Sequence, residues 1–149
     1  MGAYDRMSGG SPRSSSAGGG SLAYVLDTHA LYWYLQNPGR LTAAAEAVFR
    51  LGEVEEAQLL VPSIVVAEIF YLTKKEGRPL LPSRLTKDID ETPGFALSPL
   101  DGRVLEATER LDVAEMHDRL IAAHGLVHEA PVVTKDPALH GLAGIQAIW

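Results

Sequence analysis

The sequence predicts an α/β protein, a three-layer α/β/α sandwich with a mostly parallel central sheet of about four or five strands. Short apolar runs bounded by turn residues alternate with longer segments whose apolar residues recur at helical spacing. Strands that alternate with helices in this way form parallel sheets. Because the crossover between two parallel strands is right-handed, we expect helices on both faces of the sheet. The 149 residues, 46% of them hydrophobic, are enough for one ordinary core.

The expected elements can be placed along the chain by these patterns. We expect strands over 22–26, 58–62, 95–97, 131–133 and 144–148. We expect helices over 30–36, 41–51, 63–75, 83–89, 100–111 and 118–127, and a helical turn over 137–140. Thr42 and Ser63 are the expected caps of their helices, and Gly125 is expected to end the last one. The β-branched start of the segment at 63 also allows a strand.

Residues 1–21 differ sharply from the rest of the chain. They are dominated by glycine and serine and carry almost nothing to bury, so we expect a flexible tail, tag or linker there. No Gly-Lys-Ser/Thr follows these glycines, which excludes a phosphate-binding loop. We therefore expect a single domain over 22–149.

Charge and composition limit the function. The formal net charge is −6, which disfavours a protein that coats nucleic acid by electrostatics alone. It leaves room for a metal enzyme, because bound cations reverse the local sign of an acidic site. There is no cysteine, no apolar run near the ~20 residues that span a bilayer, and no secretory signal pattern. We expect a cytoplasmic protein without a membrane segment.

Two acidic residues follow predicted strands. Asp27 comes directly after the first strand, and Asp136 follows the strand at 131–133 after Thr134 and Lys135. The carboxyl ends of parallel strands share one edge of the sheet, where ligands bind in such folds. Both acids therefore belong to the candidate site. Each could instead only cap the turn or helix that follows it.

Two further acids can reach the same edge from helices. Glu68 lies within the apolar run VVAEIFYL, where an unpaired carboxylate is costly, and a salt bridge to an arginine is the alternative. Asp118 lies at or near a helix start, where it could simply be a cap. Carboxylates gathered in one place repel one another unless cations join them, and oxygen ligands favour Mg²⁺ or Mn²⁺. His29 and His117 adjoin two of these acids, but a packed or solvated histidine explains each of them as well.

Four ordered motifs resemble one known family. They are YVLDTHALYWYL, PSIVVAEI, HDRLIAA and VVTKDPAL, followed by a terminal IQAIW. Together they are similar to the PIN-domain ribonucleases, and most of all to the VapC-like toxins of type II toxin–antitoxin pairs. The likeness covers nearly everything from Leu22 to Trp149.

The resemblance implies a site of four acids that bind Mg²⁺ or Mn²⁺. Carried onto this sequence, the acids are Asp27, Glu68, Asp118 and Asp136. Thr134 matches a hydroxyl residue that precedes the last acid by two. Many relatives carry an extra acid three residues before the third one. Here that position is Glu115, whose role we leave as an accessory one.

The resemblance also implies an activity and partners. The expected activity is metal-dependent endonucleolytic hydrolysis of RNA, in which an activated water attacks phosphorus in line with the leaving oxygen. The expected partners are an RNA substrate, a cognate antitoxin protein and a second copy of the chain. The bulky run over 31–34 offers apolar surface for such contacts, unless core packing consumes it.

Two other functions remain open at this point. A phosphatase or receiver-type domain would use Asp27 as a phosphoryl acceptor. The dehalogenase type of phosphatase requires a second Asp at 29, where this chain has His29, and Lys135 alone gives a receiver little support. A PIN fold that acts only through protein contacts is the other alternative, although four intact acids argue against it.

Overall fold

A single parallel sheet organises the structure, a computed structural model that describes residues 22–149. The predicted tail over 1–21 lies outside the described residues. The strands are β1 (Leu22–Leu26), β2 (Ala57–Pro62), β3 (Phe95–Ser98), β4 (Val132–Val133) and β5 (Ala147–Ile148). They are ordered β3-β2-β1-β4-β5, and each pair is parallel. The predicted parallel sheet of four or five strands is confirmed.

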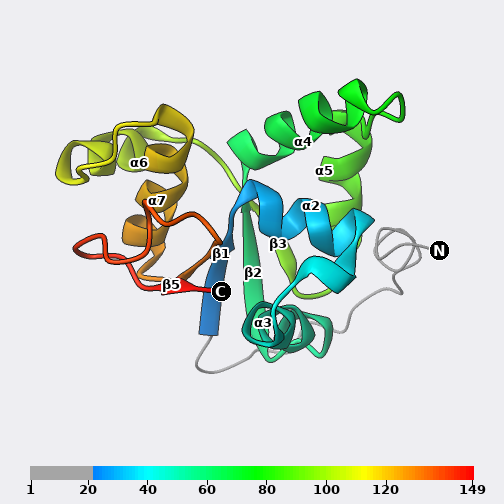
Figure 1. The fold of residues 1–149 in the computed structure, drawn as a ribbon, viewed down its shortest axis with the longest axis horizontal. Helices are drawn as coiled ribbons and strands as arrows, with labels where there is room; N and C mark the ends of the chain where they lie inside the picture. The colour runs from blue at the N-terminus through cyan, green and yellow to red at the C-terminus, as the bar shows by residue number, and fades with distance from the viewer. Residues whose placement is uncertain (1–21) are drawn as a thin grey trace.

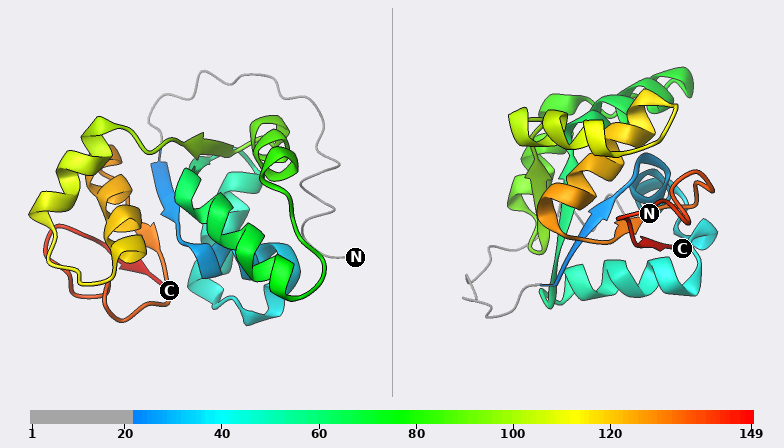
Figure 2. Two further views of the ribbon diagram at one scale, coloured as in Figure 1. Left: turned by 90° about the horizontal axis from the view of Figure 1, so that it is seen from above. Right: turned by 90° about the vertical axis from the view of Figure 1, so that its left-hand side faces the viewer.

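Helices cover both faces of this sheet, as Figures 1 and 2 show. They are α2 (Thr28–Gln36), α3 (Ala43–Glu53), α4 (Ser63–Lys75), α5 (Pro82–Glu91), α6 (Gly102–Ala107) and α7 (Met116–His128), with short 3₁₀ turns η1 (Pro38–Arg40) and η2 (Thr108–Arg110). From β1 to β3 the chain moves across the sheet in one direction, and it then returns past β1 to β4. Right-handed crossovers therefore place α2 to α5 on one face and α6 and α7 on the other.

The strand order reverses next to β1, which lies between β2 and β4. In open α/β sheets a crevice forms at such a point, outside the carboxyl ends of the strands. After β1 the chain enters α2 at once, and after β4 it passes through the turns over 137–140 before it returns as β5. The fold thus creates a site at the carboxyl end of β1 before any side chain is considered.

The core fills the space between the sheet and its helices. Val25 and Leu26 of β1 and Leu59 of β2 are completely buried, as the apolar character of these strands predicts. Tyr34 of α2 stacks on Phe49 of α3 with ring centroids 4.2 Å apart and planes 4° apart. Burial of this kind supplies most of the stability of a small domain. It also fixes α2 against the sheet, and α2 is the helix that follows β1 into the site.

The last helix differs from its prediction. It begins at Met116, two residues earlier than expected, and it continues through Gly125 to His128. A Cβ atom at Gly125 would lie 2.9 Å from Cγ2 of Val132 and 3.2 Å from the carbonyl oxygen of Ala130. The glycine therefore allows α7 to pack closely on β4 rather than ending the helix.

Other boundaries also moved, for local reasons. Ser63 does not cap α4; its hydroxyl accepts a hydrogen bond from the backbone N–H of Leu100 at 3.1 Å instead. The segment expected to be helical over 100–111 is divided into α6 and η2, and Asp101 caps α6. The segment 137–140 forms hydrogen-bonded turns, and the last strand contains only Ala147–Ile148. Thr42 caps α3 as predicted.

None of the helices in the described part of the chain has both the length and the apolar character that crossing a bilayer requires. One of the two longest helices, α4, has only 13 residues and carries Glu68 and two lysines. A spanning helix needs about 20 residues that are predominantly apolar. The helices instead present their apolar faces to the sheet.

The turn before β3 provides a test of this packing. Gly94 has a φ of 87°, and a Cβ atom there would overlap the carbonyl oxygen of Gly52 in α3. We expect Gly94→Ala to lower the free energy of unfolding by at least about 3 kcal/mol, from backbone strain and overlap together. Gly77 has a similar φ of 79° with open space around it. Gly77→Ala should cost only about 1 kcal/mol. Urea unfolding of both variants measures the difference, and equal losses would contradict it.

Candidate active site

Asp27 occupies the carboxyl end of the central strand. Its side chain is 7% exposed and caps α2, with Oδ1 accepting a hydrogen bond from the backbone N–H of Ala30 at 2.8 Å. The Thr134 hydroxyl also donates a hydrogen bond to it. Burial is the largest influence, and it raises the pKa of Asp27 above its ordinary value despite these hydrogen bonds. The capping role and the site position are therefore combined in one residue.

Asp136 lies on the neighbouring strand's side of the crevice, in the turn that follows β4. Its backbone N–H donates to the hydroxyl of Thr134 at 3.0 Å, and its Oδ1 accepts from the backbone N–H of Ala138 at 2.9 Å. The Asp-Pro turn expected there is thus present. Thr134 is completely buried and touches both acids, which explains a hydroxyl two residues before the last acid.

Glu68 approaches the crevice from α4. Its Oε1 accepts a hydrogen bond from the hydroxyl of Thr28 at 2.5 Å, and Oε2 lies 3.9 Å from Nδ1 of His117. No arginine pairs with Glu68 within residues 22–149, so the salt bridge that we considered is not formed. The Glu68 side chain is 30% exposed, so it is less buried than its apolar neighbours in the sequence lead one to expect. Val65 and Ile69 point into the core, while Glu68 lies at the edge of that face.

Asp118 completes the group from the first turn of α7. It shares a hydrogen bond with the side chain of Asp136. Partial burial, followed by that hydrogen bond and the negative charges of Asp136, Glu115 and Asp27, raises the pKa of Asp118 to about 7. A carboxyl group that is half protonated near neutral pH indicates a crowded acidic site.

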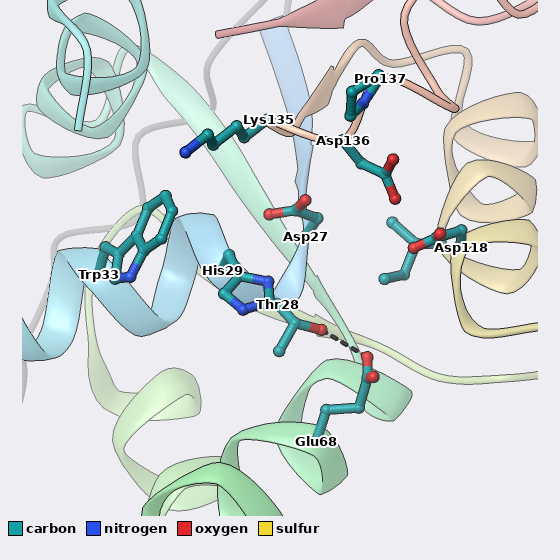
Figure 3. Close-up of a pocket in the computed structure, with 10 residues that line it drawn as sticks. Asp27, Thr28, His29, Trp33, Glu68, Asp118, Lys135, Asp136 and Pro137 are labelled. Atoms are coloured by element: carbon teal, nitrogen blue, oxygen red, sulfur yellow. Dashed lines mark hydrogen bonds between the residues drawn. The ribbon is translucent and has the colours of Figure 1, made fainter. Parts of the chain in front are cut away.

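The four acids line one pocket of about 430 Å³. Figure 3 shows their carboxylates arriving from four segments around a common space. The pocket is lined by Asp27, Thr28, His29, Trp33, Glu68, Asp118, Ile121, Lys135, Asp136 and Pro137. The structure therefore brings together all four of the residues selected from the sequence.

Glu115 and His117 lie beside the pocket and support it. Glu115 is the N-cap of α7: its carboxylate accepts from the backbone N–H of Asp118 at 2.7 Å and contacts His117 Nδ1 at 2.8 Å. Partial burial alone would raise the pKa of Glu115, but these hydrogen bonds hold it below its usual value. Glu115 thus caps the helix that carries Asp118, the role that we had considered for Asp118 itself. Neither residue is among those that line the pocket.

The donor set fits a hard divalent cation in its chemistry. It consists of carboxylates, which are the ligands of Mg²⁺ and Mn²⁺, and the raised pKa values of Asp27 and Asp118 reflect negative charge and burial that a cation would offset. Within residues 22–149, no three acidic or histidine side chains are gathered closely enough to hold one ion as they stand. A cation that bound there would have to displace the proton of Asp118 and draw the carboxylates closer together.

Trp33 and Lys135 were not expected in the pocket. Trp33 follows His29 by four residues on α2, so the two side chains lie on one face of the helix. This spacing could have revealed it. The run over 31–34 is largely buried, with Leu31 and Tyr34 in the core, so core packing consumes most of the apolar surface considered there.

His124 is the packed histidine of the chain. It is completely buried, and its Nδ1 lies 2.7 Å from the hydroxyl of Ser98. Burial, with a smaller contribution from the charge of His128, lowers the pKa of His124 to about 4. At neutral pH it is therefore an uncharged core residue.

The sequence profile of the family described as PIN domain matches residues 24–145. The chain belongs to the PIN-domain family. The matched range includes all four acids of the pocket. No curated protein sequence matches the chain.

Two solved structures share the PIN fold of this chain. A chain from the crystal structure of VapBC2 from Rickettsia felis, bound to a DNA fragment from their promoter, is 17% identical with a TM-score of 0.62; the match covers 85% of this chain and 97% of that one. A chain from a toxin–antitoxin complex from Klebsiella pneumoniae is 14% identical with a TM-score of 0.56, covering 82% and 94%. At such identities the likeness shows a common fold.

The raised pKa of Asp118 predicts how stability depends on pH when a chelator keeps the site free of metal. The folded chain binds this proton more tightly than the unfolded chain, so the contribution to stability is present at low pH and is lost as pH rises from about 4 to about 7. Asp118→Asn removes this contribution. Urea unfolding between pH 4 and 8 should show a steeper decline for the wild type than for Asp118→Asn. Parallel curves would contradict the assignment.

Proposed function

We propose that the chain is a divalent-metal-dependent endoribonuclease, the VapC-like toxin of a toxin–antitoxin pair. The observation that carries this proposal is the pocket at the carboxyl ends of β1 and β4, lined by Asp27, Glu68, Asp118 and Asp136 in a chain of the PIN-domain family. PIN domains are nucleases, and carboxylates that gather divalent cations are the usual means of cleaving phosphodiester bonds. In this proposal the substrate is RNA and the activity is cytoplasmic.

In this proposal the protein positions the reactants rather than bonding to them. A bound Mg²⁺ or Mn²⁺ supplies Lewis-acid chemistry, which lowers the pKa of water and neutralises charge on the phosphoryl oxygens. Asp27, Asp118 and Asp136 would hold the cation, and Glu68 would hold it or orient the attacking water. The helix cap and Thr134 fix Asp27, so that little reorganisation is needed at the time of reaction.

The protonation of Asp118 has a direct part in the proposed metal binding. Carboxylates bind a cation in their deprotonated form, so metal affinity should rise with pH until Asp118 is ionised. Because the pKa of Asp118 is about 7, this dependence falls in the neutral range. The chain should accordingly release the proton of Asp118 when a cation binds.

Protein partners of the chain are part of the proposal. The similar structures from Rickettsia felis and Klebsiella pneumoniae come from a VapBC pair and a toxin–antitoxin complex, which supports an antitoxin as partner. We also propose that the chain forms a homodimer, which light scattering of the purified protein tests. Expression of the wild type in a bacterial host should arrest growth, whereas Asp27→Asn should not.

The alternatives have less support from the structure. Asp27 is deeply buried and already committed to capping α2, which leaves it poorly placed as a phosphoryl acceptor. Membership of the PIN-domain family gives the phosphatase and receiver alternatives no support. A protein-binding PIN fold without catalysis predicts no metal binding, and calorimetry with Mn²⁺ distinguishes it.

Asp27→Asn is the decisive variant. Asparagine caps helices as well as aspartate and carries no buried charge, so the fold should be kept with equal or greater stability. Metal-dependent RNA cleavage should fall at least about 100-fold, because a cation ligand worth several kcal/mol of transition-state stabilisation is lost. Gel assays of RNA with and without chelator measure the change.

Asp90→Asn is the matched control, since Asp90 is exposed on α5, outside the pocket lining. It should retain full activity. Unchanged cleavage by Asp27→Asn, or by the wild type in excess chelator, would refute the proposed mechanism. Sequencing the RNA ends made by the wild type would identify the target.

A further inference from the structure

Two cations lie against Trp33, which lines the acidic pocket; Lys135 lines the pocket as well, and Arg40 contacts the ring from η1. The guanidinium carbon of Arg40, from η1, lies 4.4 Å from the centroid of the Trp33 ring, and the Lys135 ammonium, from the turn after β4, lies 5.3 Å from it. The ring of His29 is 5.4 Å away and that of Trp149 is 5.6 Å away. We call Arg40 and Lys135 the cationic rim. Two segments far apart in the chain thus bring positive charges to one aromatic ring.

The tryptophan is held much more firmly than the cations. Trp33 is 8% exposed, whereas Arg40 and Lys135 are both exposed. Within residues 22–149 neither cation forms an ion pair with a carboxylate. The electron-rich face of an indole attracts cations. Trp33 therefore positions two charges that carry no structural ion pair.

The cationic rim lies beside the acids and not among them. Figure 3 shows the Lys135 side chain extending toward Trp33, while the adjacent Asp136 extends the other way, toward Asp118. Trp33, His29 and Lys135 occupy one side of the pocket and Asp118 and Asp136 the opposite side. Asp27 lies between these two sides.

This separation of charge matches the chemistry of a polyanion whose phosphates occupy successive positions. The whole chain has a net charge of −6, so electrostatic attraction for RNA cannot come from its average surface. A phosphate beside the acidic residues is repelled by them unless a metal cation lies between. The neighbouring phosphate, farther from the acids, can be neutralised by positively charged side chains of the protein. Consecutive phosphates of one strand can bend into a concave pocket, which a stiff A-form duplex does not allow.

We propose that the cationic rim binds the phosphate next to the scissile one in single-stranded RNA, with Trp33 as the positioning residue for Arg40 and Lys135. This inference rests on the proposed ribonuclease function and names the part of the pocket that holds the substrate backbone. The contrasting explanation is that the two long side chains only cover an apolar ring. The two explanations differ in the salt dependence of RNA binding.

Lys135→Gln tests the rim by direct binding. The background is Asp27→Asn in Mg²⁺, which silences cleavage, and the probe is a fluorescein-labelled single strand of eight uridines followed by anisotropy. We expect roughly tenfold weaker binding at low salt, the effect of losing one hydrogen bond to a charged group. The slope of log Kd against log salt should become shallower by about 0.7, the value for one phosphate contact on a single strand. Arg40→Gln should act in the same direction.

Lys87→Gln is the matched control, because Lys87 is exposed on α5, outside the pocket lining, and the change in net charge is the same. It should leave both the affinity and the salt slope unchanged. An equal effect of Lys87→Gln and Lys135→Gln would overturn the proposal in favour of a general charge effect. So would unchanged binding in both Lys135→Gln and Arg40→Gln.

Two variants of Trp33 distinguish its proposed role in positioning Arg40 and Lys135 from its role in packing. Trp33→Leu removes the aromatic face without a change in charge, and it should weaken binding and flatten the salt slope. Trp33→Phe keeps an aromatic face and should restore most of both. If both variants fold and Trp33→Phe weakens RNA binding as much as Trp33→Leu does, Trp33 has no positioning role.

Tryptophan fluorescence reports directly on RNA binding near the Trp33 ring. The chain has two tryptophans, Trp33 and Trp149, so Trp33 is the sole tryptophan in Trp149→Phe and can be excited selectively over the tyrosines. Saturation with the eight-uridine strand should change this emission along the same curve as the anisotropy. RNA binding without a change in emission would place the phosphate elsewhere.

The failure of this inference can be told from the failure of the proposed function. If wild-type cleavage depends on metal and on Asp27 but the rim variants bind RNA normally, only the rim proposal falls. If the wild type neither cleaves nor binds the strand, the ribonuclease function falls and the rim proposal with it.

Discussion

The buried carboxylate of Asp27 at the end of β1 is the constraint around which the site is arranged. Burial opposes its ionisation, and the N–H of Ala30 and the hydroxyl of Thr134 offset only part of that cost. Positive charge close to a buried carboxylate stabilises its ionised form. The adjacent Asp118–Asp136 pair adds further negative charge, so the pocket as a whole favours a cation.

Much of the fold and the acid set follows from the sequence because both depend on local patterns. Apolar runs and turn residues predict five strands that alternate with helices, and this alternation predicts a parallel sheet. Asp27 and Asp136 were selected because each follows the end of a predicted strand. Glu68 was found for a reason that proved only partly correct, since its side chain is at the edge of the apolar face. Asp118 was identified mainly by resemblance, because a helix start is too common a position for an acid.

The missed features are those that depend on contacts between distant segments. Gly125 was read as a helix end because local rules cannot show that Val132 packs against it. Ser63 was read as a cap because its partner, the N–H of Leu100, is 37 residues away. The sequence leaves open whether Trp33 is surface or core, and its place in the pocket follows from its four-residue spacing from His29 together with the position of Lys135 in the turn after β4. Tertiary contacts override local preference at each of these positions.

The strand order also determines which part of the chain supplies each acid of the pocket. The layer of α2 to α5 and strands β1 to β3 comes from the first part of the described chain, and it includes Asp27 and Glu68. Asp118 and Asp136 arrive later, and Asp136 takes its place only after β4 has paired with the far side of β1. The first half of the described chain therefore carries only two of the four acids of the pocket. The pocket is complete only once β4 has paired with β1 and the turn after β4 has brought Asp136 next to Asp118.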